Sequence, residues 1–507
     1  MDKYIFFTPP KNIDTRISEL QKKPSQFWEE KGKSMALGIY KYVKTSVPAY
    51  KRFLGNSIKN DVQKIEQFTK IPPTSKGNYI KSFSFDTLFP NSMVTFNGTI
   101  SSTSGTTGEP CYFPRSLEQD LQYAYTAEII LRTQFNVHKQ KTLGLVCFGL
   151  GAWIGGIFTY KNFTSVAEKG NYPLTLLPIG PNMDLTLAAI ENMGGHYDQV
   201  ILMGYPPFVK DVLEKGKQKG IHWGNYNIKI LMAAEGITEG FRKHIAAIAE
   251  LRNPYADMCG IYGSVELGTM AYEGALSYLL RAELALHPKL QFQLFKEKGR
   301  MPTLAQYHPY LSYFEEYNRE LLCTGYGSSI PLLRYSFPDS GGVISFDEMV
   351  RAFKEYGIDI LLLAQSQGIT GTILKLPFVY VFERPNNTIS YRGANIHADQ
   401  LKDVLDRKKL ERFVTGRFTI EKKESLLLKQ KWVINIELKE FVEVKKLSRL
   451  RAEIAREAVK HLLNINSEFL DQYKSKRSGM TPVVKLFEYQ SKTFFSRNGK
   501  QQWVSKN

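Results

Sequence analysis

The chain has 507 residues, of which 43% are hydrophobic, 13% aromatic and 23% charged. This balance excludes a largely disordered protein, and the length favours about two to four domains. The formal net charge is +18, and the 124 residues from Arg384 onward hold 27 Lys and Arg against 14 Asp and Glu. Such a basic segment can bind nucleic acid, an anionic membrane or a phosphorylated small molecule. It can also be a solvated, lysine-rich surface without such a partner.

The four cysteines are scattered along the chain, at Cys111, Cys147, Cys259 and Cys323. No Cys-x-x-Cys pair and no nearby histidine cluster occurs, so a zinc site or a disulfide framework is not expected. A reducing, cytoplasmic compartment fits this pattern. The N-terminus also lacks the basic start and apolar core of a signal peptide.

Residues 142–160 form a run of 19 residues without a charge, which is close to the length of a membrane-spanning helix. Five of the 19 are glycine, and glycine is costly inside a helix in water. We therefore predict a buried strand, LGLVCF, that leads into a glycine-rich turn, and no membrane span.

In chain order, the N-terminal region is predicted to be mainly helical, with an amphipathic helix in residues 34–53 that breaks near Pro48. Further along, short apolar runs alternate with helical patterns. The predicted strands are LGLVCF, PLTLLPI, QVILMGY, IKILMAA and MCGIYG, and the predicted helices are DLTLAAIENMGG, PPFVKDVLEKGKQKG and TEGFRKHIAAIAELRN. This alternation predicts an α/β sheet with crossover helices. Residues 275–317 match no pattern that assigns them a role.

The C-terminal part of the chain has a different order of predicted elements. Its predicted elements are a strand ISYRG, a helix over 397–410, a hairpin of RFTIEKK and WVINIEL, a helix over 446–473 and a strand VVKLFEY. This β-α-β-β-α-β order is typical of a small α+β domain. A polar segment with a central proline, ERPNN at 383–387, marks the boundary. We expect a large N-terminal domain of residues 1–384 and a small basic domain of residues 385–507.

The stretch SSTSGTTGEP at 101–110 consists of serine, threonine and glycine up to Glu109. Backbone N–H groups of such a turn can converge on phosphate oxygens, and the hydroxyls can donate as well. No Gly-Lys-Ser/Thr closes the stretch, so it is not a Walker A loop. A surface loop is the alternative that the stretch alone leaves open.

TSGTTGEP at 103–110 resembles the phosphate loop of the adenylate-forming superfamily of acyl-CoA synthetases, whose typical form is SSGTTGKP. More segments resemble that family and follow in its order: AEG at 234–236, IYGSVE at 261–266, PLLRYSFPD at 331–339, ERPNN at 383–387, RGANI at 392–396 and RNGK at 497–500. SVPAY at 46–50 and IPPTSK at 71–76 are similar to segments of phenylacetate–CoA ligases and related capsule-cluster proteins. The resemblance therefore covers nearly the whole chain.

The resemblance implies a large, multi-layered α/β adenylation domain followed by a small mobile α+β domain. It also implies ATP-dependent activation of a carboxylic acid, of aromatic or aryl-acetic type, to an acyl-adenylate, and transfer of the acyl group to coenzyme A. Mg²⁺ is the implied metal. The implied site residues are Ser104, Gly105, Thr106, Thr107 and Gly108 in the phosphate loop, Ala234, Glu235, Gly236, Tyr262, Gly263, Ser264, Asp339 and Arg384 around AMP or ATP, Glu266 for the metal, Asn386 at the hinge, Lys500 and Arg384 in catalysis, and Phe148, Gly149, Tyr205 and Pro206 around the acyl group.

Elementary chemistry agrees with these roles. A carboxylate such as Asp339 can accept two hydrogen bonds from a ribose diol, and Mg²⁺ prefers oxygen ligands such as Glu266. The chain also departs from the family pattern, because Glu109 replaces a common lysine and Val265 a common threonine. Asn386 stands at the position of the hinge acid. A carboxylate at position 109 is electrostatically unhelpful beside a triphosphate.

Several alternatives stay open. An amine, a carrier protein or another acceptor could replace coenzyme A, and the departures allow a weakened homologue in a biosynthetic cluster. The run GLGAWIG at 149–155 follows a predicted strand, as in a dinucleotide-binding dehydrogenase, but Trp-Ile-Gly-Gly is expected to start a helix poorly. A nucleic-acid partner is not expected, because the tail lacks arginine clusters with interleaved aromatic residues. The expected partner is a small carboxylate, with a homodimer left open.

Overall fold

The computed structural model describes most of the chain. The described residues are 7–55, 62–94, 98–103, 110–151, 154–297, 299–382, 387–391, 394–424, 430–442, 447–475, 479–491 and 503–504. The phosphate-loop residues 104–109, Arg384, Asn386 and Lys500 lie outside these ranges.

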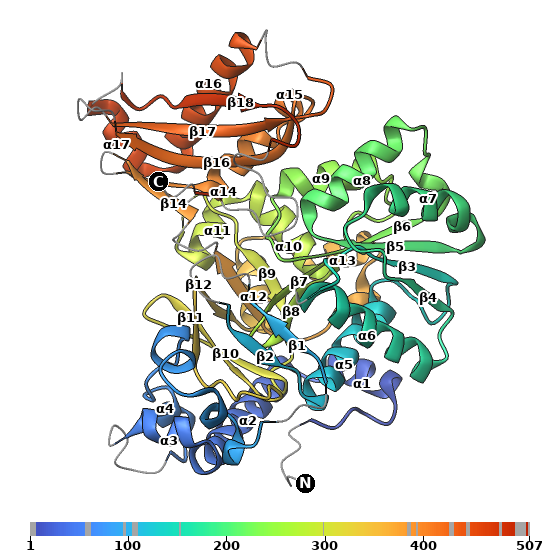
Figure 1. Cartoon of the computed structure of the whole chain (residues 1–507), viewed down its shortest axis with the longest axis vertical. Helices are drawn as coiled ribbons and strands as arrows, with labels where there is room; N and C mark the ends of the chain where they lie inside the picture. The colour runs from blue at the N-terminus through green and yellow to red at the C-terminus, as the bar shows by residue number, and fades with distance from the viewer. Residues whose placement is uncertain are drawn as a thin grey trace.

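Eleven strands form one mixed sheet (Figure 1). In spatial order they are β10 (Ser312–Tyr317), β11 (Glu320–Gly325), β12 (Tyr335–Ile344), β13 (Phe378–Phe382), β9 (Thr303–Gln306), β8 (Gly268–Glu273), β7 (Met258–Ser264), β6 (Ile228–Ala233), β5 (Gln199–Gly204), β3 (Thr142–Val146) and β4 (Leu174–Leu177). Strands β4, β3, β5, β6 and β7 pair in parallel, and the pairings from β7 to β10 are antiparallel.

The parallel half confirms the predicted strand–helix alternation. Every residue of β3 and β5 is buried, as expected where helices cover both faces of a parallel sheet. One face carries α5 (Leu117–Thr133) and α6 (Ile154–Gly170). The other carries α7 (Met183–Met193), α8 (Pro206–Gln218) and α9 (Glu239–Ile248).

The glycine-rich turn after β3 is shorter than the sequence suggested, because α6 begins at Ile154. The expectation that Trp-Ile-Gly-Gly starts a helix poorly was wrong. A Cβ on Gly156 would lie 2.3 Å from the carbonyl oxygen of Gly149, so glycine lets the helix begin directly against the strand exit. No helix in the described part of the chain is long and apolar enough to cross a membrane.

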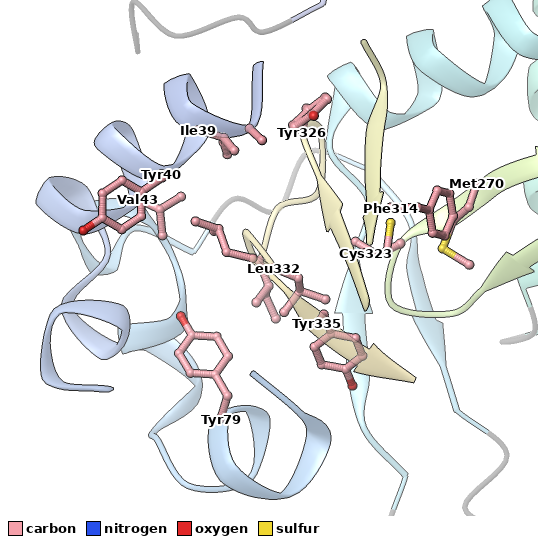
Figure 2. Close-up of a cluster of buried hydrophobic side chains, with 14 of the residues drawn as sticks. Ile39, Tyr40, Val43, Tyr79, Met270, Phe314, Cys323, Tyr326, Leu332 and Tyr335 are labelled. Atoms are coloured by element: carbon pink, nitrogen blue, oxygen red, sulfur yellow. The ribbon is translucent and has the colours of Figure 1, made fainter. Parts of the chain in front are cut away.

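The N-terminal helices are α1 (Ile13–Lys22), α2 (Ser25–Ser46), α3 (Pro48–Leu54) and α4 (Ile65–Phe68). Helices α2, α3 and α4 pack against the antiparallel half of the sheet, whereas α1 packs into the core that contains α5. The predicted break occurs at Pro48, which is the first residue of α3 and suits that position because its missing N–H has no helical partner there. Figure 2 shows Tyr40 and Val43 of α2 on one side of this core, with Phe314 and Cys323 on the strand side.

Residues 275–317, which the sequence left unassigned, form two helices and two strands of the large domain. The two helices, together with α12 and α13, bury a further core against β9 and β13. The helices are α10 (Ala275–Leu286), α11 (Pro288–Phe295), α12 (Phe346–Glu355) and α13 (Ile360–Ser366). The short helical turns are η1 (Lys76–Ile80), η2 (Phe85–Leu88), η3 (Pro90–Ser92), η4 (Gly194–His196), η5 (Trp223–Tyr226) and η6 (Thr370–Thr372).

The C-terminal elements build a separate core and stand at one end of the molecule in Figure 1. They are β14 (Thr388–Tyr391), β15 (Ala394–His397), α14 (Ala398–Leu405), α15 (Lys408–Glu411), β16 (Val414–Glu424), β17 (Gln430–Leu438), α16 (Ser448–Ile465), α17 (Ser467–Ser475) and β18 (Val483–Phe487). Strands β16, β17 and β18 form one sheet, and β14 pairs with β15 in a second. The helix predicted over 446–473 is divided at Asn466, whose side chain accepts a hydrogen bond from Phe469 N at 2.9 Å.

Candidate active site

The carboxyl ends of β3 and β5 form the topological switch point of the parallel sheet. After β3 the chain crosses to β4 on one side, and after β4 it returns to β5 on the other side of β3. Ligands of open α/β sheets bind in the crevice outside such a point. Phe148 and Tyr205 follow these two strand ends, and Cys147 N donates to Met203 O at 2.8 Å between them.

The predicted acyl-pocket residues near this crevice lie in three different places, namely the cores on the two faces of the sheet and the pocket between the domains. Phe148 is 5% exposed and packs in the core under α5 and α6, and the carbonyl of Gly149 touches the start of α6. Tyr205 packs with the core on the opposite face of the sheet. Pro206 lines a pocket between the two domains. The four residues thus surround the strand ends, and their side chains do not form one cluster.

The loop after β6 carries the segment AEG. Ala234 has a φ of +81°, a backbone conformation in which an L-residue is strained and glycine is favoured. A Cβ on Gly236 would lie 3.0 Å from Thr303 Oγ1 of β9, so glycine allows the loop to pass close to that strand. Strain of this kind persists where the surrounding structure holds it, and it is frequent at ligand sites.

Two predicted nucleotide-binding residues, 77 positions apart, meet across the sheet. The hydroxyl of Tyr262 on β7 donates to Asp339 Oδ2 on β12 at 3.1 Å. Gly263 and Ser264 complete β7, and Ser264 Oγ accepts from Leu267 N at 3.1 Å. This bond closes the turn between β7 and β8, which carries Glu266.

Glu266 is half-buried in that turn, and a guanidinium that the sequence did not single out lies close to it. Arg115 donates through Nη2 to Val265 O and through Nε to Ser101 Oγ at 3.2 Å. Burial lowers the pKa of Arg115 to about 10, and the carboxylate of Glu266 opposes this effect. The described residues contain no group of three or more His, Cys, Asp or Glu that could hold a metal. A magnesium ion held mainly by nucleotide phosphates needs only one or two protein carboxylates, so Glu266 fits that role.

The predicted phosphate loop is carried by a hairpin of β1 (Ile100–Ser102) and β2 (Tyr112–Pro114). At its base Thr103 N donates to Cys111 O at 3.0 Å, and Cys111 N donates to Thr103 Oγ1 at 3.0 Å. Lys76 Nζ donates to the same hydroxyl at 3.3 Å. Sequence reasoning quoted the segment IPPTSK without assigning Lys76 a role, yet its ammonium lies at the loop base, where a phosphate would be attracted.

The segment that holds Lys76 is bound to a second family-like segment. Thr74 Oγ1 donates to Leu333 O at 2.7 Å, and Ser336 N donates to Thr74 O at 2.8 Å. Arg334 forms a buried ion pair with Glu315 at 2.6 Å. These bonds tie the base of the phosphate hairpin to the strand that carries Asp339.

A pocket lies between the two domains. It is lined on the large domain by the AEG loop, Thr238, Phe241 and the start of α8, and on the small domain by α14, β16 and Trp503. Lys402 Nζ lies 4.0 Å from the centroid of the Trp503 ring, within the range of a cation–π contact. Trp503, three positions after Lys500 in the sequence, lines this pocket together with Glu235 and Gly236.

Paired charges join the same two domains. Arg417 of β16 contacts Asp211 of α8 at 2.9 Å and Glu437 at 3.3 Å. Burial alone would lower the pKa of Arg417, and the two carboxylates raise it. Arg417 is thus a cation of the basic tail that has an acidic partner in the large domain.

A second ion-pair group, centred on Glu214 of α8, lies beside the first. Glu214 contacts Lys439 at 2.8 Å and His244 at 2.9 Å. His244 contacts Glu411 of the small domain at 2.9 Å. The small domain is therefore held against α8 and α9 by several buried or half-buried charges.

Comparisons with known proteins were made on sequence and on structure. No protein-family model and no curated protein matches the chain. The fold is similar to that of 2-hydroxyisobutyryl-CoA ligase in the postadenylation state, with a TM-score of 0.66 at 13% identity over 100% of this chain and 95% of that one. For the thioesterification state of that enzyme, at the same identity and coverage, the TM-score is 0.54.

AtGH3.15 acyl acid amido synthetase is also similar, with a TM-score of 0.58 at 12% identity over 99% of this chain and 96% of that one. The chain therefore has the fold of the adenylate-forming enzymes, as the sequence predicted. Over the whole chain the TM-score is higher against the postadenylation state of the CoA ligase than against its thioesterification state.

Proposed function

We propose that the protein activates a carboxylic acid with ATP to form an acyl-adenylate and then transfers the acyl group to coenzyme A. The observation that carries the proposal is the 3.1 Å hydrogen bond between Tyr262 and Asp339. This bond joins IYGSVE and PLLRYSFPD, two of the segments that resemble the adenylate-forming family, in a fold of that type. The strained loop at Ala234 and Trp503 border the same region.

In this proposal the adenine lies along the AEG loop and Tyr262. The carboxylate of Asp339 accepts hydrogen bonds from the two ribose hydroxyls. The phosphates lie against residues 104–108, and Lys76 adds positive charge at the base of that loop. Glu266 would hold Mg²⁺, which when bound neutralises charge on the phosphates.

The first reaction is an in-line displacement. A carboxylate oxygen of the acid forms a bond to the α-phosphorus, the bond from that phosphorus to the bridging oxygen breaks, and pyrophosphate leaves. Such a step depends on positioning and on neutralising charge. We assign Lys500 to the bridge between the substrate carboxylate and the α-phosphate, and Arg384 to the nucleotide beside it. The place of Trp503, which follows Lys500 by three positions and lines the pocket beside the AEG loop, supports the assignment of Lys500.

The second reaction transfers the acyl group. The thiol sulfur bonds to the carbonyl carbon, the bond from that carbon to the phosphate oxygen breaks, AMP leaves, and the thiol proton goes to solvent. Asn386 is proposed as the pivot about which the small domain turns between the two reactions. The acid is proposed to be of aromatic or aryl-acetic type, bound at the strand ends by Phe148, Gly149, Tyr205 and Pro206. The unpaired cysteines agree with a cytoplasmic enzyme.

The test is pyrophosphate–ATP exchange over a panel of carboxylic acids, with pyrophosphate release measured with and without coenzyme A. We expect exchange with at least one acid, and its loss in Lys500→Ala with an unchanged thermal unfolding profile. Normal exchange in Lys500→Ala would refute the assignment of that lysine. A wild-type chain that binds no ATP and exchanges with no acid would refute the proposed function.

A second acceptor is an amine, which would make the product an amide. The likeness in fold to AtGH3.15 acyl acid amido synthetase favours this candidate. The two candidates share the adenylation step and differ only in the second reaction. Incubating the adenylated enzyme with coenzyme A or with an amine panel, and identifying the product by mass spectrometry, decides between them.

A further inference from the structure

Two buried polar side chains beside the β7–β8 turn have atoms without hydrogen-bond partners among the described residues. Arg115 is 3% exposed and Gln119 is 4% exposed. Nη1 of Arg115 and both amide atoms of Gln119, Oε1 and Nε2, have no partner there. Leaving a buried polar atom in this way is unfavourable, so each needs a compensating partner.

The two side chains lie around the same turn and the same ring. Arg115 donates to Val265 O, just before Glu266, and its Cζ lies 5.7 Å from the centroid of the Phe158 ring. A Cβ on Gly268, at the end of the turn, would lie 3.2 Å from Gln119 Nε2 and 3.6 Å from Phe158 Cε1. Arg115 and Gln119 therefore meet the β7–β8 turn from the side of Phe158.

The neighbourhood of these polar groups is aromatic. The Phe158 and Tyr123 rings stack with centroids 4.5 Å apart and an interplanar angle of 14°. Phe148, at the end of β3, belongs to the same core cluster. A hydroxyl or carboxylate of a ligand that reaches this neighbourhood would meet two donors and one acceptor beside aromatic side chains.

The charge of Arg115 also limits what it binds. Its two acidic neighbours are Glu266 and Asp120, and Asp120 is already paired with Lys161 at 2.5 Å. Nε and Nη2 are used within the fold, so Nη1 is the part of the guanidinium left to meet an oxygen of a ligand. An arginine whose other nitrogens are fixed presents that donor with little loss of entropy.

We infer that the acid carries, besides its reacting carboxylate, a second oxygen-bearing group on its ring, a hydroxyl or a carboxylate, which Arg115 and Gln119 hold. This inference rests on the proposed function and narrows its substrate class. It also identifies Arg115 and Gln119 as specificity-determining residues, which the sequence patterns did not single out.

The experiment compares acids that differ in one group. Hydroxyphenylacetates and carboxyphenylacetates are measured against methylphenylacetates substituted at the same ring position, with pyrophosphate release giving kcat/KM. The wild type should favour the best oxygenated acid over its methyl analogue at least tenfold, because a buried polar site rejects a group that cannot pair with it. Gln119→Leu and Arg115→Met should each remove most of this preference. Gln119→Leu should also leave the KM for ATP within about twofold, since its amide has no assigned role at the nucleotide.

Thr126→Val is the matched control, because Thr126 is buried on the same helix and its hydroxyl is satisfied by Gln122 O at 3.0 Å. It should keep the preference. If Arg115→Met does not fold, Gln119→Leu decides alone. A wild type that prefers the methyl analogues overturns the inference while the proposed function stands. A higher KM for ATP with unchanged preference overturns it too, because Arg115 would then serve the phosphates. No exchange with any acid refutes the proposed function and this inference together.

Discussion

The ion pairs of Glu214 should make the docking of the small domain sensitive to acid. Burial alone would raise the pKa of Glu214, but the hydrogen bond from His244 and the charges of Lys210 and Lys439 lower it from 4.5 to about 2. A difference of this size corresponds to about 3 kcal/mol in favour of the folded, ionised form. Because the folded pKa is lowered, this contribution is present above pH 4.5 and is lost as the pH falls towards 2.

The perturbation is Glu214→Gln, measured by urea unfolding at steps from pH 7 to pH 3. At pH 7 the variant should lose up to about 3 kcal/mol of unfolding free energy, and its deficit should shrink below pH 4.5 as the wild type loses the same term. Glu440→Gln is the control, because Glu440 also bridges the domains, to Lys215 at 2.9 Å, with its side chain 56% exposed. An exposed pair of this kind contributes about 1 kcal/mol or less. Equal pH profiles for the two variants would refute the reasoning.

Two further predictions concern the nucleotide site and the start of α6. Tyr262→Phe removes the hydrogen bond to Asp339 and should raise the KM for ATP roughly three- to tenfold, whereas the exposed Tyr112→Phe should leave it unchanged; an unchanged KM in both would separate Tyr262 from the nucleotide. Gly156→Ala places a Cβ 2.3 Å from a carbonyl oxygen and should cost about 1–3 kcal/mol in urea unfolding. Gly38→Ala, with nothing within 4 Å, should instead stabilise α2 by about 0.5–1 kcal/mol, and the reverse ranking would contradict the packing argument.

The parallel half of the sheet could be predicted because its signals are local. Apolar runs such as QVILMGY and IKILMAA are strands buried on both faces, and the amphipathic runs between them are crossover helices. The antiparallel half was harder to predict. Strands such as β9 and β10 carry mixed polar and apolar residues. They are buried partly by α10 to α13 and partly by the N-terminal region, which lies far away in the sequence.

The residues of the candidate site also fall into two groups, those that local motifs indicate and those whose place only the packing shows. Tyr262, Glu266 and Asp339 could be proposed as site residues from the sequence because each lies in a segment with several informative residues. Lys76 and Arg115 were missed as site residues, since a lone lysine or arginine has no local pattern that distinguishes it from a surface cation. Only the packing of the hairpin against β7 and η1 shows where their charges lie.

The sequence by itself determined which runs of the parallel half are strands and which are helices, and its motifs predicted the adenylate-forming fold, because hydrophobic periodicity and short motifs are properties of neighbouring residues. The order of the strands in the sheet came from the structure. Only the tertiary structure decided which of those segments meet. The contact between Tyr262 and Asp339 spans 77 positions, and the one between Glu214 and Lys439 joins two domains. Such contacts depend on how whole elements pack, because only packing brings polar and charged side chains from distant segments within bonding distance.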